Sequence, residues 1–166
     1  MKHAASKYRP FPPVRLTDRT WPDQTIARAP VWMSTDLRDG NQALFEPMDA
    51  GKKLGMFKML CEIGFKEIEV AFPAASQTDF DFVRTLIEGG HIPDDVTIEV
   101  LTQARPALIE RTIESLAGAK QAIVHVYTAT SPVFRDTVFA MQREDVVKMA
   151  VDAVRQIRDL CHARPE

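Results

Sequence analysis

From residue 30 onward, short runs rich in apolar and β-branched residues alternate with helix-like segments of ten or more residues. The runs that predict strands are 31–37, 66–72 (KEIEVAF), 96–101 and 122–127 (AIVHVY). Strands that alternate with helices of this length form right-handed βαβ crossovers. The alternation therefore predicts an α/β protein with a parallel sheet.

Helix start signals support this interpretation. Asp49 stands where it can cap a helix over 52–64, and Ser76 with Asp79 forms an S-x-x-D signal before the next helical segment. Pro106 suits the first position of a third helix, because its ring fixes φ at a helical value. Three of the four strand-like runs are thus followed by a helix with a recognisable beginning.

A fourth helix is predicted from about residue 144 to residue 161, after an irregular stretch over 128–139. An apolar stripe at helical spacing predicts the face that packs against the rest of the protein. This stripe consists of Val147, Ala150, Val154, Ile157 and Cys161.

Both an open doubly wound sheet and a TIM barrel are built from such units. The doubly wound fold expects a glycine-rich turn after its first strand, whereas the segment DLRDGNQ at 36–42 has only Gly40. A barrel takes roughly 250 residues and eight strand-helix units. We therefore predict the first four units of a TIM (β/α)8 barrel, as a truncated catalytic domain over residues 30–166.

Residues 1–29 differ from the rest of the chain. They contain six Lys or Arg residues against two Asp residues, and four of the eleven prolines. This composition predicts an extended basic arm. Phe11 and Trp21 are expected to dock on a neighbouring surface.

Composition excludes several classes of function. The 166 residues carry a formal net charge of -2, so no overall positive charge points to nucleic acid. No run approaches the roughly 18 apolar residues that a membrane helix needs, and no signal peptide is recognisable at the amino terminus. Cys61 and Cys161 lie in helix-like segments. We expect a soluble protein of the reducing cytoplasm.

The segment DLRDGNQ places charged residues at the carboxyl end of the first predicted strand, where α/β enzymes carry their chemistry. Side chains alternate along a strand, so Asp36 and Arg38 are expected to face the same way, with Asp39 on the turn beyond. Carboxylates are hard ligands for magnesium or manganese, and a guanidinium can stabilise an oxyanion. The alternative is a buried salt bridge between Arg38 and one aspartate.

A resemblance to a known family rests on four segments: LTDRTWPDQTIARAPVWMSTDLRDGNQAL, GFKEIEVAFPAASQTDF, LTQAR and AIVHVYTATS. Together they resemble the 2-isopropylmalate synthase family, and the match runs through nearly the whole chain. The pattern D-x-R-D-G-x-Q alone is similar to a wider group, the DRE-TIM metallolyase superfamily. That superfamily includes homocitrate and citramalate synthases and hydroxymethylglutaryl-CoA lyase. RTWPD and EIEVAFPAASQTDF narrow the resemblance to the first family.

The resemblance implies condensation of acetyl-CoA with 2-oxoisovalerate to give 2-isopropylmalate and CoA, at the entry to leucine synthesis. It also implies a homodimer, a divalent metal ion (Mg, Mn or Zn) and a monovalent cation as an activator. Arg38 matches the family's catalytic arginine and Asp39 its carboxylate metal ligand. His125 matches a histidine that lines the oxo-acid pocket, although a histidine in an apolar strand can equally be a satisfied core residue.

Other polar residues are weaker candidates for substrate binding. Gln42 ends the motif, and Glu69 alternates with apolar neighbours in its strand, so it requires a partner such as Arg38 unless it faces solvent. The remaining candidates follow the third and fourth strands and serve equally well as helix caps or turn formers. They are Arg105, Thr128, Thr130 and Ser131.

Part of the family's pattern has no counterpart in this sequence. The family's two histidine ligands, spaced H-x-H, are missing, and the four histidines present are isolated. We therefore expect the 166-residue chain by itself to lack synthase activity, and to associate through the edges of its sheet. Two alternatives stay open: a homocitrate or citramalate synthase, and a non-catalytic half-barrel that serves as a binding module.

Overall fold

A computed structural model describes residues 17–18 and 29–163 of the chain, and its helices and strands lie in the unit that begins at Val31. The predicted arm over 1–29 lies almost entirely outside the described residues. Its extended conformation and the docking of Phe11 and Trp21 therefore stay predictions.

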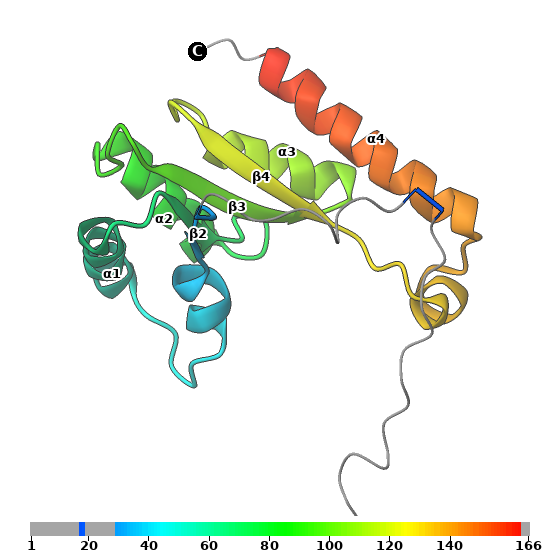
Figure 1. The fold of residues 1–166 in the computed structure, drawn as a ribbon, viewed down its shortest axis with the longest axis horizontal. Helices are drawn as coiled ribbons and strands as arrows, with labels where there is room; N and C mark the ends of the chain where they lie inside the picture. Colours follow the sequence, from blue (N-terminus) through cyan, green and yellow to red (C-terminus); the bar gives the residue numbers. More distant parts are fainter. Residues whose placement is uncertain (1–16, 19–28, 164–166) are drawn as a thin grey trace, which may run out of the picture. The chain divides into compact units, whose positions relative to one another are not determined.

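Four parallel strands form one sheet, as Figure 1 shows. They are β1 (Met33–Ser34), β2 (Glu67–Ala71), β3 (Thr97–Gln103) and β4 (Ala122–Tyr127). Their order in the sheet is β1-β2-β3-β4, and each neighbouring pair is parallel. A doubly wound sheet reverses its order at a switch point, and the described strands contain no such reversal. The arrangement is that of the first four units of a TIM barrel, which confirms the predicted fold class.

A helix follows each strand. These helices are α1 (Ala50–Ile63), α2 (Gln77–Glu88), α3 (Pro106–Ser115) and α4 (Arg143–His162). The predicted caps are confirmed: the side chains of Asp49 and Ser76 accept hydrogen bonds from Lys52 N and Asp79 N, and Pro106 begins α3. None of the described helices combines the length and the apolar character needed to cross a membrane.

The main core lies between the sheet and the first two helices. Alternate residues of β2 and β3, such as Val70 and Val100, are fully buried and belong to one cluster with Phe57 of α1 and Phe82 of α2. A second cluster joins α3 and α4 through Ile109, and Val124 of β4 packs against it. The period of two along each strand sends the intervening side chains, including Glu69, Glu99 and His125, to the opposite face.

The predicted extent of the first strand is wrong. Extended pairing stops after Ser34, and residues Asp36–Gly40 form a π-helical turn, η3, in which Gly40 N donates to Thr35 O at 3.2 Å. The Ser34 hydroxyl donates to Asp36 Oδ2 at 2.6 Å across the start of this turn. The alternation rule predicted that Asp36 and Arg38 share one face of a strand. This prediction is wrong, because both residues lie in the π-helical turn.

The predicted packing face of the last helix is wrong in part: Ile157 packs as expected, whereas Val147 and Val154 do not, and the predicted bounds are close. Val147 and Val154 are 58% and 44% exposed, and the buried residues are Val146 and Ala153. The face that packs on α3 includes Ala153, Met149 and Leu160 together with the predicted Ile157. The stretch predicted to be irregular contains a second π-helical turn, η4 (Phe134–Phe139).

Candidate functional site

Arg38 is the central cation at the carboxyl edge of the sheet. It lies in η3, just after β1, and its Nε donates to Glu69 Oε2 of β2 at 3.0 Å. The Glu69 side chain is only 1% exposed, so this contact gives a buried carboxylate the charged partner it requires. The contact between Arg38 and Glu69 suggested by the sequence is confirmed, and the alternative in which Glu69 faces solvent is wrong.

Asp39 lies on the outer side of the same guanidinium. Its Oδ1 pairs with Arg38 Nη1, and its side chain is 61% exposed. Asp36, the other aspartate of the motif, accepts a hydrogen bond from Ser34 instead. Arg38 thus makes an exposed ion pair with Asp39 and a buried ion pair with Glu69. The buried partner is a glutamate of β2 and not one of the two aspartates of the motif.

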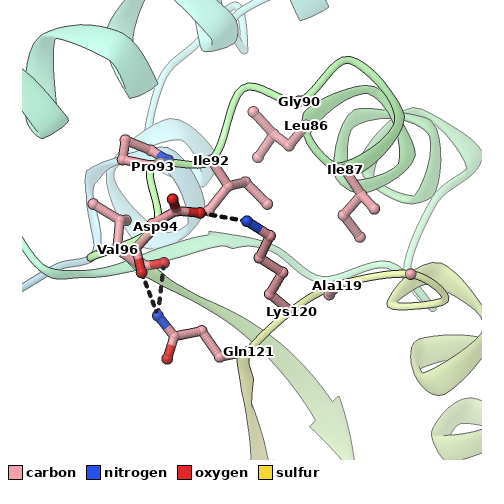
Figure 2. A pocket seen from close by; sticks show the side chains of 11 residues that line it. Leu86, Ile87, Gly90, Ile92, Pro93, Asp94, Val96, Ala119, Lys120 and Gln121 are labelled. Carbon is pink, nitrogen blue, oxygen red and sulfur yellow. Dashed lines mark hydrogen bonds and ion pairs between the residues drawn. The ribbon is translucent and has the colours of Figure 1, made fainter. Parts of the chain in front are cut away.

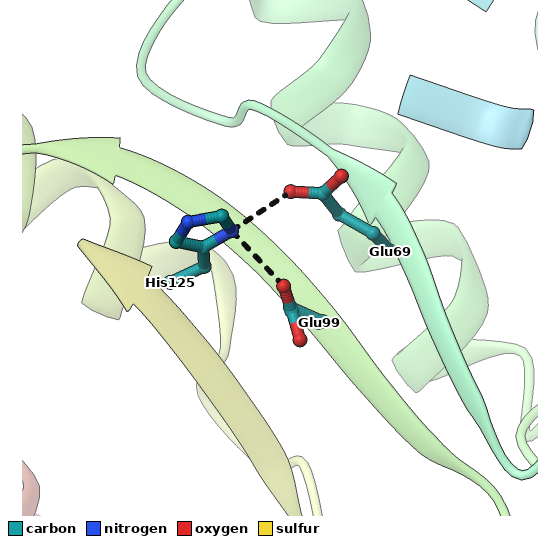
Figure 3. Close-up of side chains that lie close together, drawn as sticks. All are labelled: Glu69, Glu99 and His125. Atoms are coloured by element: carbon teal, nitrogen blue, oxygen red, sulfur yellow. Dashed lines mark ion pairs between the residues drawn. The ribbon is translucent and has the colours of Figure 1, made fainter. Parts of the chain in front are cut away.

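His125 brings two buried carboxylates together on the face of the sheet opposite the helices (Figure 3). Its Nδ1 lies 3.1 Å from Glu99 Oε1 and 3.3 Å from Glu69 Oε1. The three side chains come from three neighbouring strands, β4, β3 and β2. The His125 side chain is 45% exposed, so it is not a satisfied core histidine.

The electrostatics of this cluster are unusual for carboxylates. Burial raises the pKa of Glu99, the charge of Glu69 raises it further, and His125 acts in the opposite direction. Glu69 Oε1 is buried and accepts no hydrogen bond of good geometry, although Nδ1 of His125 lies 3.3 Å away. One ring nitrogen therefore faces two acceptor oxygens.

The ligand atoms of Glu69, Glu99 and His125 lie within 4.8 Å of one another, which is close enough to surround a cation. Asp39 does not belong to this group of three. Glu69 already has a guanidinium at 3.0 Å. A divalent cation between the three side chains would be repelled by that neighbouring positive charge. These three side chains, with Arg38 beside them, are therefore better suited to share a proton than to bind a metal ion.

Three of the weaker sequence candidates, Gln42, Arg105 and Thr128, line two grooves at the same edge of the sheet. Gln42 and Arg38 line a groove of about 530 Å³ that also contains Lys53 and Asp79. Arg105 and Thr128 line another of about 630 Å³, beyond the ends of β3 and β4. The Arg105 side chain caps no backbone group of α3. Thr130 is exposed, and the Ser131 hydroxyl accepts from Phe134 N at the start of the irregular stretch.

Two features of this region are not among the residues predicted from the sequence. Glu99 is one of them, and the repeated tripeptide I-E-V at 68–70 and 98–100 could have revealed it, because both glutamates interrupt buried strands at paired positions. The other is Lys53, whose side chain is 1% exposed and donates to Asp79 Oδ1 at 3.1 Å. No local signal in the sequence marks a lysine on α1 as buried.

A further cavity lies at the opposite edge of the sheet, near the amino ends of β3 and β4 (Figure 2). It has a volume of about 260 Å³, and Asp94 and Lys120 form an ion pair within its lining. In barrels of this kind the amino-terminal edge contributes to stability and the carboxyl edge to chemistry. This cavity is therefore not part of the candidate site.

Comparison with known proteins places these residues in a family. A protein-family model described as HMGL-like matches residues 29–163. The chain is 70% identical over 166 residues to the "2-isopropylmalate synthase" of Ralstonia nicotianae, 65% identical to that of Azotobacter vinelandii and 62% identical to that of Pseudomonas fluorescens. These alignments include 100% of the chain but only 29%, 30% and 30% of the respective relatives.

The chain thus spans less than a third of the length of these curated relatives. The resemblance noted in the sequence is confirmed over its full extent. The parallel sheet, the motif at 36–42 and the matched residues 29–163 agree with one another. The chain therefore belongs to the HMGL-like family.

Proposed function

We propose that this chain forms the amino-terminal part of a 2-isopropylmalate synthase, which condenses acetyl-CoA with 2-oxoisovalerate and releases CoA. The observation that carries the proposal is the fixed guanidinium of Arg38, held by buried Glu69 at 3.0 Å and flanked by Asp39 at the carboxyl edge of the sheet. A preorganised cation beside a carboxylate suits a reaction in which negative charge develops on a ketone oxygen.

Arg38 has the donor capacity for this role. Its Nε is directed to Glu69 and its Nη1 to Asp39, and a guanidinium has five N–H donors in all. In the proposed reaction a remaining N–H donates to the ketone oxygen of the oxo acid. Because the two carboxylates fix the guanidinium beforehand, little reorganisation accompanies the change in charge.

Asp39 is the proposed metal ligand. Its carboxylate is the exposed one of the two that hold Arg38, and hard carboxylate oxygens fit magnesium, manganese or zinc. When bound, such an ion polarises the ketone carbonyl as a Lewis acid. One carboxylate does not complete a coordination sphere, so this chain contributes a single side-chain ligand in the proposal. A monovalent activator, a homodimer and a cytoplasmic location belong to the same proposal.

His125 is proposed to contact the oxo acid. Its Nδ1 faces the glutamates, whereas its other ring nitrogen points away from both of them (Figure 3). Gln42, in the groove beside Arg38, is a second proposed contact. Together these groups surround one end of a small anionic substrate, while the identity of its side chain depends on the rest of the pocket.

A chimeric enzyme tests the proposal. In this chimera, residues 1–166 replace the matching segment of the Ralstonia nicotianae relative, to which they are 70% identical. CoA release is measured with acetyl-CoA and each of three oxo acids: 2-oxoisovalerate, pyruvate and 2-oxoglutarate. We expect turnover with 2-oxoisovalerate and little with the other two. Preference for pyruvate or 2-oxoglutarate would support a citramalate or homocitrate synthase instead.

Asp39→Asn in the chimera should weaken divalent-metal binding and remove most condensation activity, because an amide is a poorer ligand for a hard cation. The matched control is Asp152→Asn, which changes an exposed aspartate of α4 that pairs with Lys148. Activity and metal dependence that survive Asp39→Asn would contradict the assignment. The 166-residue chain alone should show no CoA release, and light scattering should detect its association.

A further inference from the structure

The cluster of Glu69, Glu99 and His125 contains a proton position that the proposed function does not assign. Arg38 lies 3.0 Å from Glu69, and its guanidinium stays charged in proteins. This contact occupies Glu69 Oε2 with a hydrogen bond donated by Arg38 Nε, and Oε1 is the oxygen left to face His125. A carboxylate paired with a guanidinium in this way offers its second oxygen as an acceptor.

The atom nearest to that acceptor decides the state of the imidazole ring. His125 Nδ1 lies 3.3 Å from Glu69 Oε1, which is buried and accepts no well-formed hydrogen bond. If Nδ1 carried a lone pair, two acceptors would face each other and the buried oxygen of Glu69 would have no donor, which is unfavourable. A hydrogen on Nδ1 removes this conflict.

Glu99 supports the same ring nitrogen from the next strand. Its Oε1 lies 3.1 Å from Nδ1, within the usual range for a hydrogen bond, and its side chain is 8% exposed. We propose that Glu99 is a positioning residue for His125: with Glu69, it holds Nδ1 in the protonated form, so that the other ring nitrogen, Nε2, points away from both glutamates (Figure 3).

This arrangement has a consequence for substrate binding, which rests on the proposed function. With a hydrogen fixed on Nδ1, the neutral ring can only accept at Nε2, and it becomes a donor to an anionic oxo acid when it takes up a second proton. The charged groups around the ring are Glu69 and Glu99 in direct contact, Arg38 beyond Glu69, and Glu67 near Glu99. Replacing Glu99 removes one of the two carboxyl oxygens that face Nδ1, so the ring loses a contact that fixes its orientation toward the oxo acid.

The first test uses the 166-residue chain and does not depend on activity. In the chain labelled with [¹⁵N]histidine, protonated and unprotonated ring nitrogens have well-separated resonances, and His125→Asn identifies the signals of His125. We expect Nδ1 to be protonated in the neutral ring. In Glu99→Gln, we expect loss of this single tautomer, because the amide can rotate and present either an acceptor or a donor to Nδ1.

The second test measures kinetics in the chimera. Glu99→Gln should raise KM for 2-oxoisovalerate on the order of tenfold, the size typical of losing a group that orients a functional histidine. KM for acetyl-CoA should change less than about twofold. Glu99→Asp should restore part of the effect, because it retains the charge.

Glu67→Gln is the matched control, since it removes a neighbouring charge on β2 without touching Nδ1 of His125. A neutral His125 ring protonated on Nε2, or a Glu99→Gln variant with the tautomer of the parent chain, would overturn the proposal.

Loss of a tightly bound divalent ion from Glu99→Gln, with Asp39 intact, would identify a metal site instead and also overturn it. An unmodified chimera that fails to condense its substrates contradicts the proposed function. It does not affect the result for the His125 tautomer, which is measured in the 166-residue chain.

Discussion

The two faces of the sheet bury side chains in opposite ways. Toward the helices, β2 and β3 present residues such as Val70 and Val100, which are fully buried among other apolar groups. Toward the other face, the same strands present Glu69 and Glu99, which are 1% and 6% exposed. One residue of displacement along a strand thus separates an apolar core from a charged cluster.

The difference shows where stability and chemistry come from. A fully buried apolar side chain contributes roughly 1.5–3 kcal/mol to folding, whereas a buried ion pair often contributes nothing or costs free energy. Glu69 is tolerated because Arg38 and His125 face it. We therefore expect substitutions on the helix side to change the free energy of unfolding. Substitutions on the other face should chiefly change binding and turnover.

The largest expected effect is on the helix side. Phe57→Ala should lower the free energy of unfolding of the 166-residue chain by about 3–5 kcal/mol, because it leaves a cavity in a fully buried part of α1. Urea unfolding followed by circular dichroism measures the change. Met59→Ala, on the same helix but 46% exposed, is the control and should stay within about 0.5 kcal/mol. Equal losses would mean that the main core has been misplaced.

On the other face, Arg38→Lys should affect the reaction more than the fold. An ammonium keeps a charge beside Glu69 but cannot reproduce the planar set of donors that also reaches Asp39. We expect kcat of the chimera to fall about 10²–10³-fold, as when one preorganised donor is removed. Arg155→Lys, an exposed change on α4, should leave kcat unaltered. Near-normal turnover in Arg38→Lys would make Arg38 a structural residue.

The corrected face of α4 gives a smaller effect. Val146 is 4% exposed and Val147 is 58% exposed, so the two neighbours form a matched pair. Val146→Ala should cost about 1.5 kcal/mol, from the apolar carbons removed from the core at roughly 0.8 kcal/mol each. Val147→Ala should stay within about 0.5 kcal/mol. If Val147→Ala instead lowers the free energy of unfolding more than Val146→Ala does, Val147 is buried as the sequence predicted.

That stripe shows a limit of periodicity as a predictor. In α4 the residues Val146, Val147, Val151 and Val154 are all apolar, so a helical period fits more than one face. The face that is buried depends on α3, a partner that the local pattern does not contain. The caps at Asp49 and Ser76 were predictable because each acts within a single turn.

The site was predictable only in part, for a similar reason. The motif at 36–42 was sufficient to place the side chains of Arg38 and Asp39 together, because the two residues are adjacent in the sequence. The alternation of side chains expected for a strand failed there, because residues Asp36–Gly40 form a π-helical turn and the Ser34 hydroxyl donates to Asp36 at its start. The contact of Glu99 with His125 links residues 26 positions apart across two strands, so it required the register of the sheet.

The smallest expected effect concerns the cap that begins α2. Ser76 Oγ accepts from Asp79 N at 3.1 Å, while Asp79 itself accepts from Phe72 N at 3.0 Å and from buried Lys53. Ser76→Ala removes one of these links and should cost about 1 kcal/mol in urea unfolding, the typical value of an N-cap. Ser76→Asp is the control, because its carboxylate can accept the same hydrogen bond.

This cap also lies beside the groove that contains Arg38, so the same variant sharpens the contrast between the two faces. If the helix side supplies stability alone, Ser76→Ala should leave kcat and both KM values of the chimera within about twofold, because its small destabilisation of a folded enzyme changes no contact of Arg38. A tenfold loss of kcat, with Ser76→Asp restoring it, would show that the start of α2 holds the groove in its active shape. The separation of stability from chemistry would then fail at this edge of the sheet.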